Sequence, residues 1–312
     1  MAERKDRNKP IDFICTNNVA DVTDRLAGLA PSEQTLPGYL FWLSRPRFWL
    51  YLAGPVAVGV VYASTAAGQF FQPITVALFL YFLIPANVYL YGVNDIFDAD
   101  IDELNPKKAD DGREVRYTGG TGVQAAVLAA ALLGGGFISV LPTAGVAGLA
   151  AFLLLGGAYS APPLRLKTTP LLDSVSNGLY VMPGVVGYAA VAGTFPPIVA
   201  VAGGWVWAMG MHTFSAIPDI EPDRAAGIRT TATLLGTHRT LAYCAGVWLV
   251  AAVLMSVVHP YLGVVLGVYP VFVATIAAAT VDIDRAYWWF PVLNTVAGTA
   301  FTLGGIWVIQ YG

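Results

Sequence analysis

Two clusters of acidic side chains lie about 120 residues apart, and each follows a long apolar run. The first is NDIFDADID at 94–102 and the second is DIEPD at 219–223. Only 12% of the chain is charged and 56% is hydrophobic, so clustered carboxylates are costly unless a positive group joins them. Mg²⁺ prefers oxygen ligands and commonly combines one or two carboxylates with substrate phosphates. We therefore expect the two clusters to bind two Mg²⁺ ions and a diphosphate.

The first cluster has helical spacing. Asn94 and Asp98 stand four residues apart, and Asp95, Asp98 and Asp102 follow an i, i+3, i+7 pattern, so each set shares one stripe of a helix. Carboxylates on one stripe repel each other and raise each other's pKa, and a divalent cation removes that repulsion. We predict these four residues as metal ligands. Taken alone, the cluster is equally consistent with a helix end that carries solvated acids.

The second cluster repeats the spacing of the first. Asp219 and Asp223 are again four residues apart, after an apolar run and before a polar loop with basic residues. Pro218 and Pro222 interrupt the helix, and irregular backbone at membrane depth is tolerated where it lines a cavity. The repeat favours metal binding over solvated acids. It also suggests two similar four-helix halves that offer their helix ends to one central cavity.

Basic and aromatic side chains near the clusters complete the candidate site. Basic groups could hold diphosphate oxygens, although each is also typical of a membrane-interface anchor. The basic candidates are Arg47, Arg165, Lys167, Arg224 and Arg229. Aromatic faces in or near the cavity could stabilise a cation by roughly 0.5–2 kcal/mol each. The aromatic candidates are Tyr89, Tyr91, Trp205, Trp207 and Phe214.

Long apolar segments must position these residues. A spanning helix needs about 20 predominantly apolar residues, and nine runs meet this requirement. They are roughly 47–67, 74–96, 122–140, 143–160, 172–192, 197–217, 239–258, 261–280 and 288–310. We therefore predict an all-α integral membrane protein, with about nine transmembrane helices in a bundle around a central cavity. A polar segment at 1–40 precedes this transmembrane domain at 41–312, and the ninth helix follows the two four-helix halves.

The connectors between these runs alternate in charge. Those near 68–73, 141–142, 193–196 and 259–260 carry no Lys, Arg, Asp or Glu, so all 17 basic residues fall on the side of the N-terminus. The positive-inside rule makes that side cytoplasmic and, with nine spans, places the C-terminus outside. The net charge of −3 gives no reason to expect a nucleic-acid partner. The three histidines are scattered and predict no zinc site.

Three segments resemble the UbiA superfamily of intramembrane prenyltransferases. NDIFDADID at 94–102 is similar to the NDxxDxxxD signature of that family, and DIEPDRAAGIRTTATLLG at 219–236 to its DxxxD signature. YSAPPLRLK at 159–167 is the third segment, and it departs from the family's Tyr-x-x-x-Lys spacing because Lys167 lies eight residues after Tyr159. The resemblance covers all nine predicted spans.

The resemblance implies a helical bundle whose cavity opens sideways to lipid. Mg²⁺ would join Asn94, Asp98, Asp219 and Asp223 to a prenyl diphosphate, with Asp95 and Asp102 in support. The residues implied to contact the leaving group or orient the carboxylates are Tyr159, Arg165, Lys167 and Arg229.

Longer matches resemble the carotenoid branch of the superfamily. They are NDIFDADIDELNPKK followed by GREVRY, and FSAIPDIEPDRAAG. This likeness implies transfer of a dimethylallyl group from dimethylallyl diphosphate to lycopene, on the way to C50 carotenoids. Alternatives are an aromatic, chlorophyllide or glycerol-phosphate acceptor within the same superfamily, or an ion-coupled transporter. A transporter is disfavoured because the acids lie at one end of the predicted helices and not near the midplane.

Overall fold

The computed structural model describes residues 32–102, 117, 119–279 and 281–311, and within them all regular structure is helical. The predicted all-α class is confirmed. The α-helices are α2 (Leu36–Leu43), α3 (Trp49–Ala63), α4 (Pro73–Leu83), α5 (Pro85–Asp102), α6 (Thr121–Gly136), α7 (Thr143–Ser160), α8 (Leu172–Val175), α9 (Met182–Ala192), α10 (Ile198–Ser215), α11 (Ile220–Ala225), α12 (Thr231–Val258), α13 (Pro260–Leu266), α14 (Val268–Ala279) and α15 (Ile283–Tyr311).

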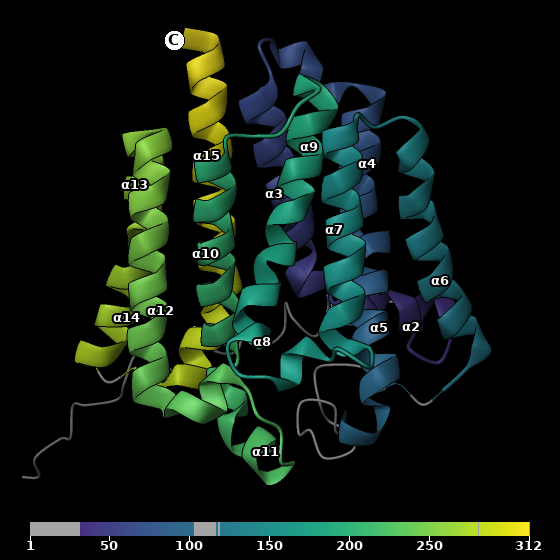
Figure 1. Cartoon of the computed structure of the whole chain (residues 1–312), viewed down its shortest axis with the longest axis vertical. Coiled ribbons are helices and arrows are strands. Elements are labelled where there is room, and N and C mark those ends of the chain that lie inside the picture. Colours follow the sequence, from purple (N-terminus) through teal and green to yellow (C-terminus); the bar gives the residue numbers. More distant parts are fainter. Residues whose placement is uncertain (1–31, 103–116, 118, 280, 312) are drawn as a thin grey trace, which may run out of the picture.

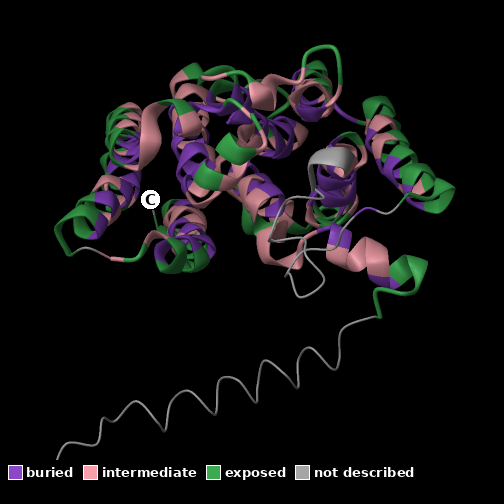
Figure 2. Ribbon diagram, turned by 90° about the horizontal axis from the view of Figure 1, so that it is seen from below, coloured by how far each residue is buried: buried purple, intermediate pink, exposed green. Residues whose placement is uncertain are grey.

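The long helices run roughly side by side and form a bundle (Figure 1). The short helices α2, α8 and α11 lie at its lower end, whereas the chain ends at the upper end of α15. The first and last helices of the described chain thus reach opposite ends of the bundle, as an odd number of spans requires. Seen from below, exposed residues lie mainly on the outward sides of the peripheral helices (Figure 2).

Each of the nine predicted runs contains a helix, and seven segments are long and apolar enough to cross a bilayer among the described residues. These seven are Pro73–Ala99, Thr121–Ser139, Thr143–Ser160, Leu172–Ala192, Thr231–Val258, Pro260–Ala279 and Ile283–Ile309. The two other runs hold α3, with 15 residues, and α10. The count of nine spans therefore stays a prediction.

The start of α12 lies earlier than expected. The sequence places a connector at 218–238, but the helix begins at Thr231 because the Thr230 hydroxyl caps it by accepting the backbone N–H of Thr233 at 3.1 Å. Gly236, at φ 71°, then interrupts the helical backbone. The continuous part of α12 begins after this glycine, close to the predicted start at 239.

The described residues form two hydrophobic cores. In the first core, the Phe82 and Phe152 rings pack edge to face at 5.2 Å. In the second core, the Phe214 and Phe290 rings lie 4.8 Å apart. The first core also includes Leu179, Met182 and Val186 of the fifth predicted run, because α9 packs against α3. The division therefore differs from the predicted one, which places that run in the second half. At one crossing of α3 and α9, Gly59 and Gly184 let the backbones approach closely.

Candidate active site

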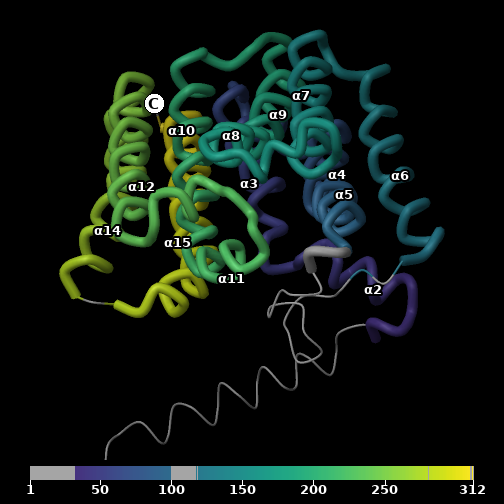
Figure 3. The backbone as a smooth tube through the Cα atoms, turned by 60° about the horizontal axis from the view of Figure 1, so that its bottom comes forward, coloured from purple at the N-terminus to yellow at the C-terminus, as the bar shows by residue number. Residues whose placement is uncertain are grey.

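The two acidic clusters lie at the same end of the bundle. The last turns of α5 carry the first cluster, and α11, with the short turn η7 (Ile217–Asp219) before it, carries the second. Figure 3 brings this end forward and shows α8, α11 and the end of α5 on it. The helix that carries the first cluster extends to Asp102, beyond the predicted end of this run at 96, which agrees with the helical spacing of the cluster. The side chain of Asp102 lies outside the described residues.

Lys167 joins the two predicted ligands of the first cluster. Its Nζ donates to Asn94 Oδ1 at 3.1 Å and also contacts Asp98 Oδ2. Arg165 Nη2 donates to Asp98 Oδ1 at 3.1 Å, and Ser160 Oγ donates to Asn94 Oδ1 at 2.9 Å. A single cation therefore bridges the amide oxygen and the carboxylate that stand four residues apart on α5.

The turn after α7 aims these basic side chains at α5. Arg165 precedes the turn η5 (Leu166–Thr168) and has the left-handed φ of 42°. This conformation costs a residue with a side chain about 1–2 kcal/mol. The Arg165 contacts with Asp98 and with the Phe97 carbonyl at 3.0 Å offset that cost. Strain held by contacts to a predicted metal ligand is typical of a functional site.

A second basic residue, Arg45, holds Asp95. Arg45 Nη2 lies 3.4 Å from Asp95 Oδ1, and Asp95 is 1% exposed. The Arg45 guanidinium also lies 4.4 Å from the centre of the Tyr91 ring, in a cation–π arrangement. Arg45 was not among the predicted diphosphate contacts, although its position just before the first predicted span was the available signal.

The second acidic cluster also affects the ammonium group of Lys167. Burial lowers the pKa of Lys167 to about 7, and the charges of Asp95 and Asp223 act on it in the opposite direction. One acid from each cluster therefore influences Lys167. The ammonium form depends on surrounding negative charge, and a bound diphosphate would favour it further.

Tyr159 pairs with a histidine that the sequence did not single out. The Tyr159 hydroxyl and His212 Nε2 lie 3.1 Å apart, and their rings meet edge to face. His212 lies on α10, seven residues before Asp219, which was the available signal. Tyr159 thus pairs with His212, and Lys167 contacts Asn94 and Asp98 instead, in keeping with the altered spacing of this motif.

A buried aspartate outside both acidic clusters holds the loop that follows the second cluster. Asp173, on α8, is fully buried and accepts hydrogen bonds from the backbone N–H of Thr231 at 2.9 Å and from the Thr231 hydroxyl. Because Thr231 begins α12, these bonds hold the chain just after α11 against α8. The sequence offered little signal for Asp173, since it is a single acid at the start of an apolar run.

The remaining basic candidates have other contacts. Arg47 Nη2 donates to the carbonyls of Tyr287 at 3.0 Å and Trp288 at 2.9 Å, and its guanidinium lies over the Trp288 ring. Arg224 pairs with the exposed Glu221 at 2.9 Å. Arg229 is exposed and lines a shallow cleft with Arg224. In this structure, Arg165 and Lys167 are the predicted basic residues that contact the first cluster directly.

The predicted aromatic residues divide between the helix packing and a cavity. Tyr89 donates to the Leu153 carbonyl at 2.6 Å, and Trp205 donates to the Val175 carbonyl at 2.8 Å. Phe214 is fully buried in the second core. Trp207 lines a large cavity, whereas Tyr91 lies under Arg45 beside the first cluster.

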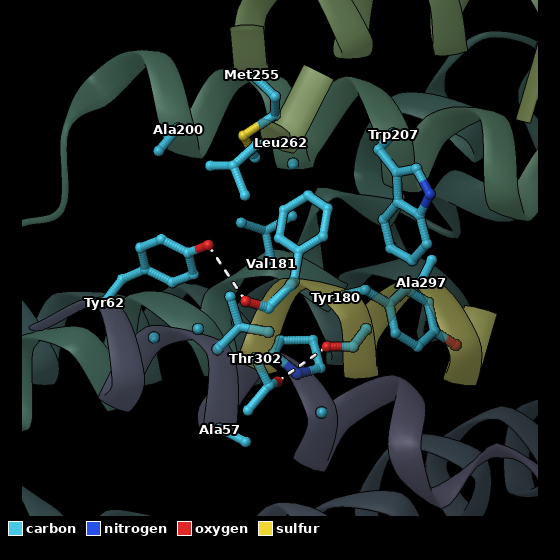
Figure 4. Close-up of a pocket in the computed structure, with 18 of the residues that line it drawn as sticks. Ala57, Tyr62, Tyr180, Val181, Ala200, Trp207, Met255, Leu262, Ala297 and Thr302 are labelled. Atoms are coloured by element: carbon cyan, nitrogen blue, oxygen red, sulfur yellow. Dashed lines mark hydrogen bonds between the residues drawn. The ribbon is translucent and has the colours of Figure 1, made fainter. Parts of the chain in front are cut away.

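This cavity has a volume of about 590 Å³ and is lined mainly by apolar side chains of α3, α9, α10, α13 and α15. It extends along α3 from Leu50 to Tyr62, or about 18 Å at the rise of an α-helix. In Figure 4, Trp207 and Tyr180 lie toward one side of the cavity and Tyr62 toward the other. The end at Tyr51 and Tyr180 is nearest the first cluster, because the Phe48 ring lies 5.2 Å from Tyr51 and 6.3 Å from Tyr91.

Comparison with known proteins decides the family. The model of the UbiA prenyltransferase family matches residues 52–306, which is most of the chain. The chain belongs to the UbiA prenyltransferase family. The resemblance seen in the motifs is thereby confirmed.

Named relatives of this UbiA-family chain are close in sequence and match it over most of its length. The lycopene elongase/hydratase of Haloarcula japonica is 61% identical over 290 residues, covering 93% of this chain and 98% of the relative. The lycopene elongase/hydratase of Halobacterium salinarum is 59% identical over 274 residues, covering 88% and 99%. The chain is thus similar to whole enzymes of this name.

Solved structures of UbiA homologues share the fold. A homologue from Archaeoglobus fulgidus bound to DMAPP and Mg²⁺ aligns with a TM-score of 0.68 at 21% identity, covering 88% of this chain and 99% of that one. A homologue from Aeropyrum pernix aligns with a TM-score of 0.64 at 20% identity, covering 85% and 99%. At these identities the likeness concerns the fold.

The oxygen atoms of this UbiA-family site suit a hard cation. Lys167 already places a positive charge between Asn94 Oδ1 and Asp98 Oδ2, and amide and carboxylate oxygens are ligands that Mg²⁺ accepts. Among the described residues, no three His, Cys, Asp or Glu side chains converge as a ready-made metal cluster.

Proposed function

We propose that this chain transfers a dimethylallyl group from dimethylallyl diphosphate to lycopene in C50 carotenoid biosynthesis. The observation that carries the proposal is the identity of about 60% with lycopene elongase/hydratases over nearly their whole length. The apolar cavity beside the acidic clusters supports the same conclusion, because a wholly hydrocarbon acceptor needs an apolar site.

Asn94, Asp98, Asp219 and Asp223 are proposed to hold two Mg²⁺ ions, with Asp95 and Asp102 in support. When bound, the ions would neutralise charge on the diphosphate and so favour its departure. Lys167 and Arg165 would exchange their contacts with Asp98 for diphosphate oxygens. Arg45, which is bound to Asp95, would keep that acid in place.

The cavity would protect the reactive cation from water. Cleavage of the donor C–O bond leaves an allylic cation, and water would quench it before transfer in an open site. The terminal alkene of the acceptor attacks this cation and forms the new C–C bond. Loss of a proton, or addition of water, then completes the product.

The membrane orientation is also part of the proposal. Arg45, Arg165 and Lys167 contact the first acidic cluster, and α11, which carries Arg224 and part of the second cluster, lies at the lower end of the bundle in Figure 1. By the positive-inside rule, this end would face the cytoplasm and the end of α15 would face outward. The donor would then enter from the cytoplasm and the lipophilic acceptor from the bilayer.

The test is the pigment profile of lycopene-accumulating bacteria that express the chain. We expect carotenoids heavier than lycopene by one or two five-carbon units, with or without added water, detected by chromatography and mass spectrometry. Cells that express the Asp98→Asn variant provide the matched control. Unchanged lycopene, with the protein shown to be in the membrane, would contradict the proposed acceptor and direct the search to an aromatic acceptor within the family.

A further inference from the structure

A small hydrogen-bonded cluster interrupts the apolar wall of the cavity. It consists of Tyr51 on α3, Tyr269 on α14 and Asn294 on α15, and all three residues line the cavity. The Tyr269 hydroxyl donates to Asn294 Oδ1 at 2.9 Å, and Asn294 Nδ2 donates to the Tyr51 hydroxyl oxygen at 2.8 Å. Each hydrogen bond of the cluster therefore donates toward Tyr51, whose hydroxyl oxygen accepts the last one.

Two other hydroxyl groups on the wall donate to backbone carbonyls. Tyr62 donates to the Phe301 carbonyl at 3.2 Å, and Thr302 donates to the Gly298 carbonyl at 2.9 Å. The Tyr51 hydroxyl differs, because it accepts from Asn294 and its hydrogen has no acceptor among the described residues. It keeps one donor and one lone pair for a polar molecule in the cavity.

A second unsatisfied group lines the same end of the cavity. The indole N–H of Trp207 is buried beside the Tyr269 hydroxyl, without good hydrogen-bond geometry to any described residue. The Trp207 ring lies 5.8 Å from the Tyr269 ring, edge to face. A buried water molecule requires two to four polar partners, and such partners gather here in an otherwise apolar cavity.

The cluster of Tyr51, Tyr269 and Asn294 lies where the last step of the proposed reaction would take place. Tyr51 lies at the end of the cavity nearest the acids, with the Tyr180 ring 6.3 Å away and Phe48 between it and Tyr91. An acceptor that extends along the cavity would place its reacting alkene at this end. The carbocation left on the acceptor after C–C bond formation would therefore form beside Tyr51.

We propose that Tyr51, oriented by Asn294 and Tyr269, holds the water molecule that adds to the carbocation of the elongated product. This inference rests on the proposed prenyl transfer and assigns the hydration step to named residues. The water donates a hydrogen to the Tyr51 oxygen and turns its lone pair toward the cation. The new C–O bond forms, and the proton lost from the added water leaves with the diphosphate, the base released in the first step.

The experiment compares products of the intact protein and of Tyr51→Phe in lycopene-accumulating cells. Hydrated and unhydrated products differ in mass by one water, and growth in ¹⁸O-labelled water identifies the added oxygen. We expect Tyr51→Phe to keep elongation and to lower the ratio of hydrated to unhydrated product by roughly tenfold, as loss of one hydrogen bond to the reacting water implies. Tyr269→Phe should shift the ratio in the same direction by less, because it acts through Asn294.

Tyr81→Phe is the matched control. The Tyr81 hydroxyl is also buried and has no partner among the described residues, but Tyr81 lies on α4 outside the cavity wall. This variant should leave the ratio unchanged. A Tyr51→Phe ratio equal to that of the intact protein, or a fall of the same size in Tyr81→Phe, would overturn the proposal. An absence of elongated product from the intact protein would instead reject the proposed function.

Discussion

At the scale of single residues, the candidate site is held together by basic groups that contact acids. Lys167 contacts Asn94 and Asp98, whereas Arg45 holds Asp95. Buried acids of this kind are stable only when they are paired, so the basic residues stabilise the site before a metal or a substrate binds. The same groups are then available to the leaving diphosphate.

Removal of a single charge from either cluster should lower the rate of catalysis sharply without unfolding the protein. We expect Asp98→Asn and Asp219→Asn each to lower turnover by about 10²-fold or more, because each would remove charge that holds Mg²⁺ against the departing diphosphate. Turnover is measured on detergent-purified protein with dimethylallyl diphosphate, lycopene and Mg²⁺, and gel filtration checks the fold.

Glu221→Gln is the control for this experiment. Glu221 stands within the second cluster sequence, but its side chain is 81% exposed and pairs with Arg224. The Glu221→Gln variant should retain near-normal turnover. Full activity in both Asp98→Asn and Asp219→Asn would contradict a metal site that is shared by the two clusters.

At the scale of helices, close packing of α3 against α9 positions the cavity. A Cβ atom on Gly59 would lie only 2.1 Å from the Gly184 carbonyl oxygen, which is a backbone atom that cannot turn aside. Both helices line the cavity, so any separation of the two would also change its width.

Gly59→Ala should therefore destabilise the bundle. Forcing a methyl group into a packed interface costs about 1–3 kcal/mol, so we expect a lower midpoint of thermal unfolding in detergent. Gly54→Ala is the matched change on the same helix, because a Cβ at Gly54 meets nothing within 4 Å. Equal unfolding midpoints in the two variants would show that the backbones do not approach closely at Gly59.

At the scale of the whole molecule, the charge distribution predicts which end faces the cytoplasm. This is tested with single cysteines in a background of Cys15→Ser and Cys244→Ala. Glu221→Cys lies at the end that carries the clusters, and Gln72→Cys is exposed on the connector that follows α3 at the opposite end. A membrane-impermeant maleimide should label Gln72→Cys in intact cells and Glu221→Cys only after lysis. The reverse pattern would invert the proposed orientation.

Much of the architecture could be predicted from the sequence, because a bilayer tolerates few charges and requires long helices. Apolar runs indicated the helices, and the i, i+4 spacing of Asn94 and Asp98 placed both on one stripe of α5. The early start of α12 could not be read from hydropathy, since it depends on the local cap at Thr230.

The tertiary structure decided which side chains meet. The sequence by itself determined the family, the helical class and the two acidic clusters, because these follow from motif spacing and from the cost of charge in an apolar chain. It did not determine that Lys167 bridges Asn94 and Asp98, or that Tyr159 meets His212. Nor did it bring Tyr51, Tyr269 and Asn294 together, since they lie on three helices and Tyr51 is 243 residues from Asn294. Such contacts depend on helix packing and on the path of each connecting turn, which no local pattern encodes.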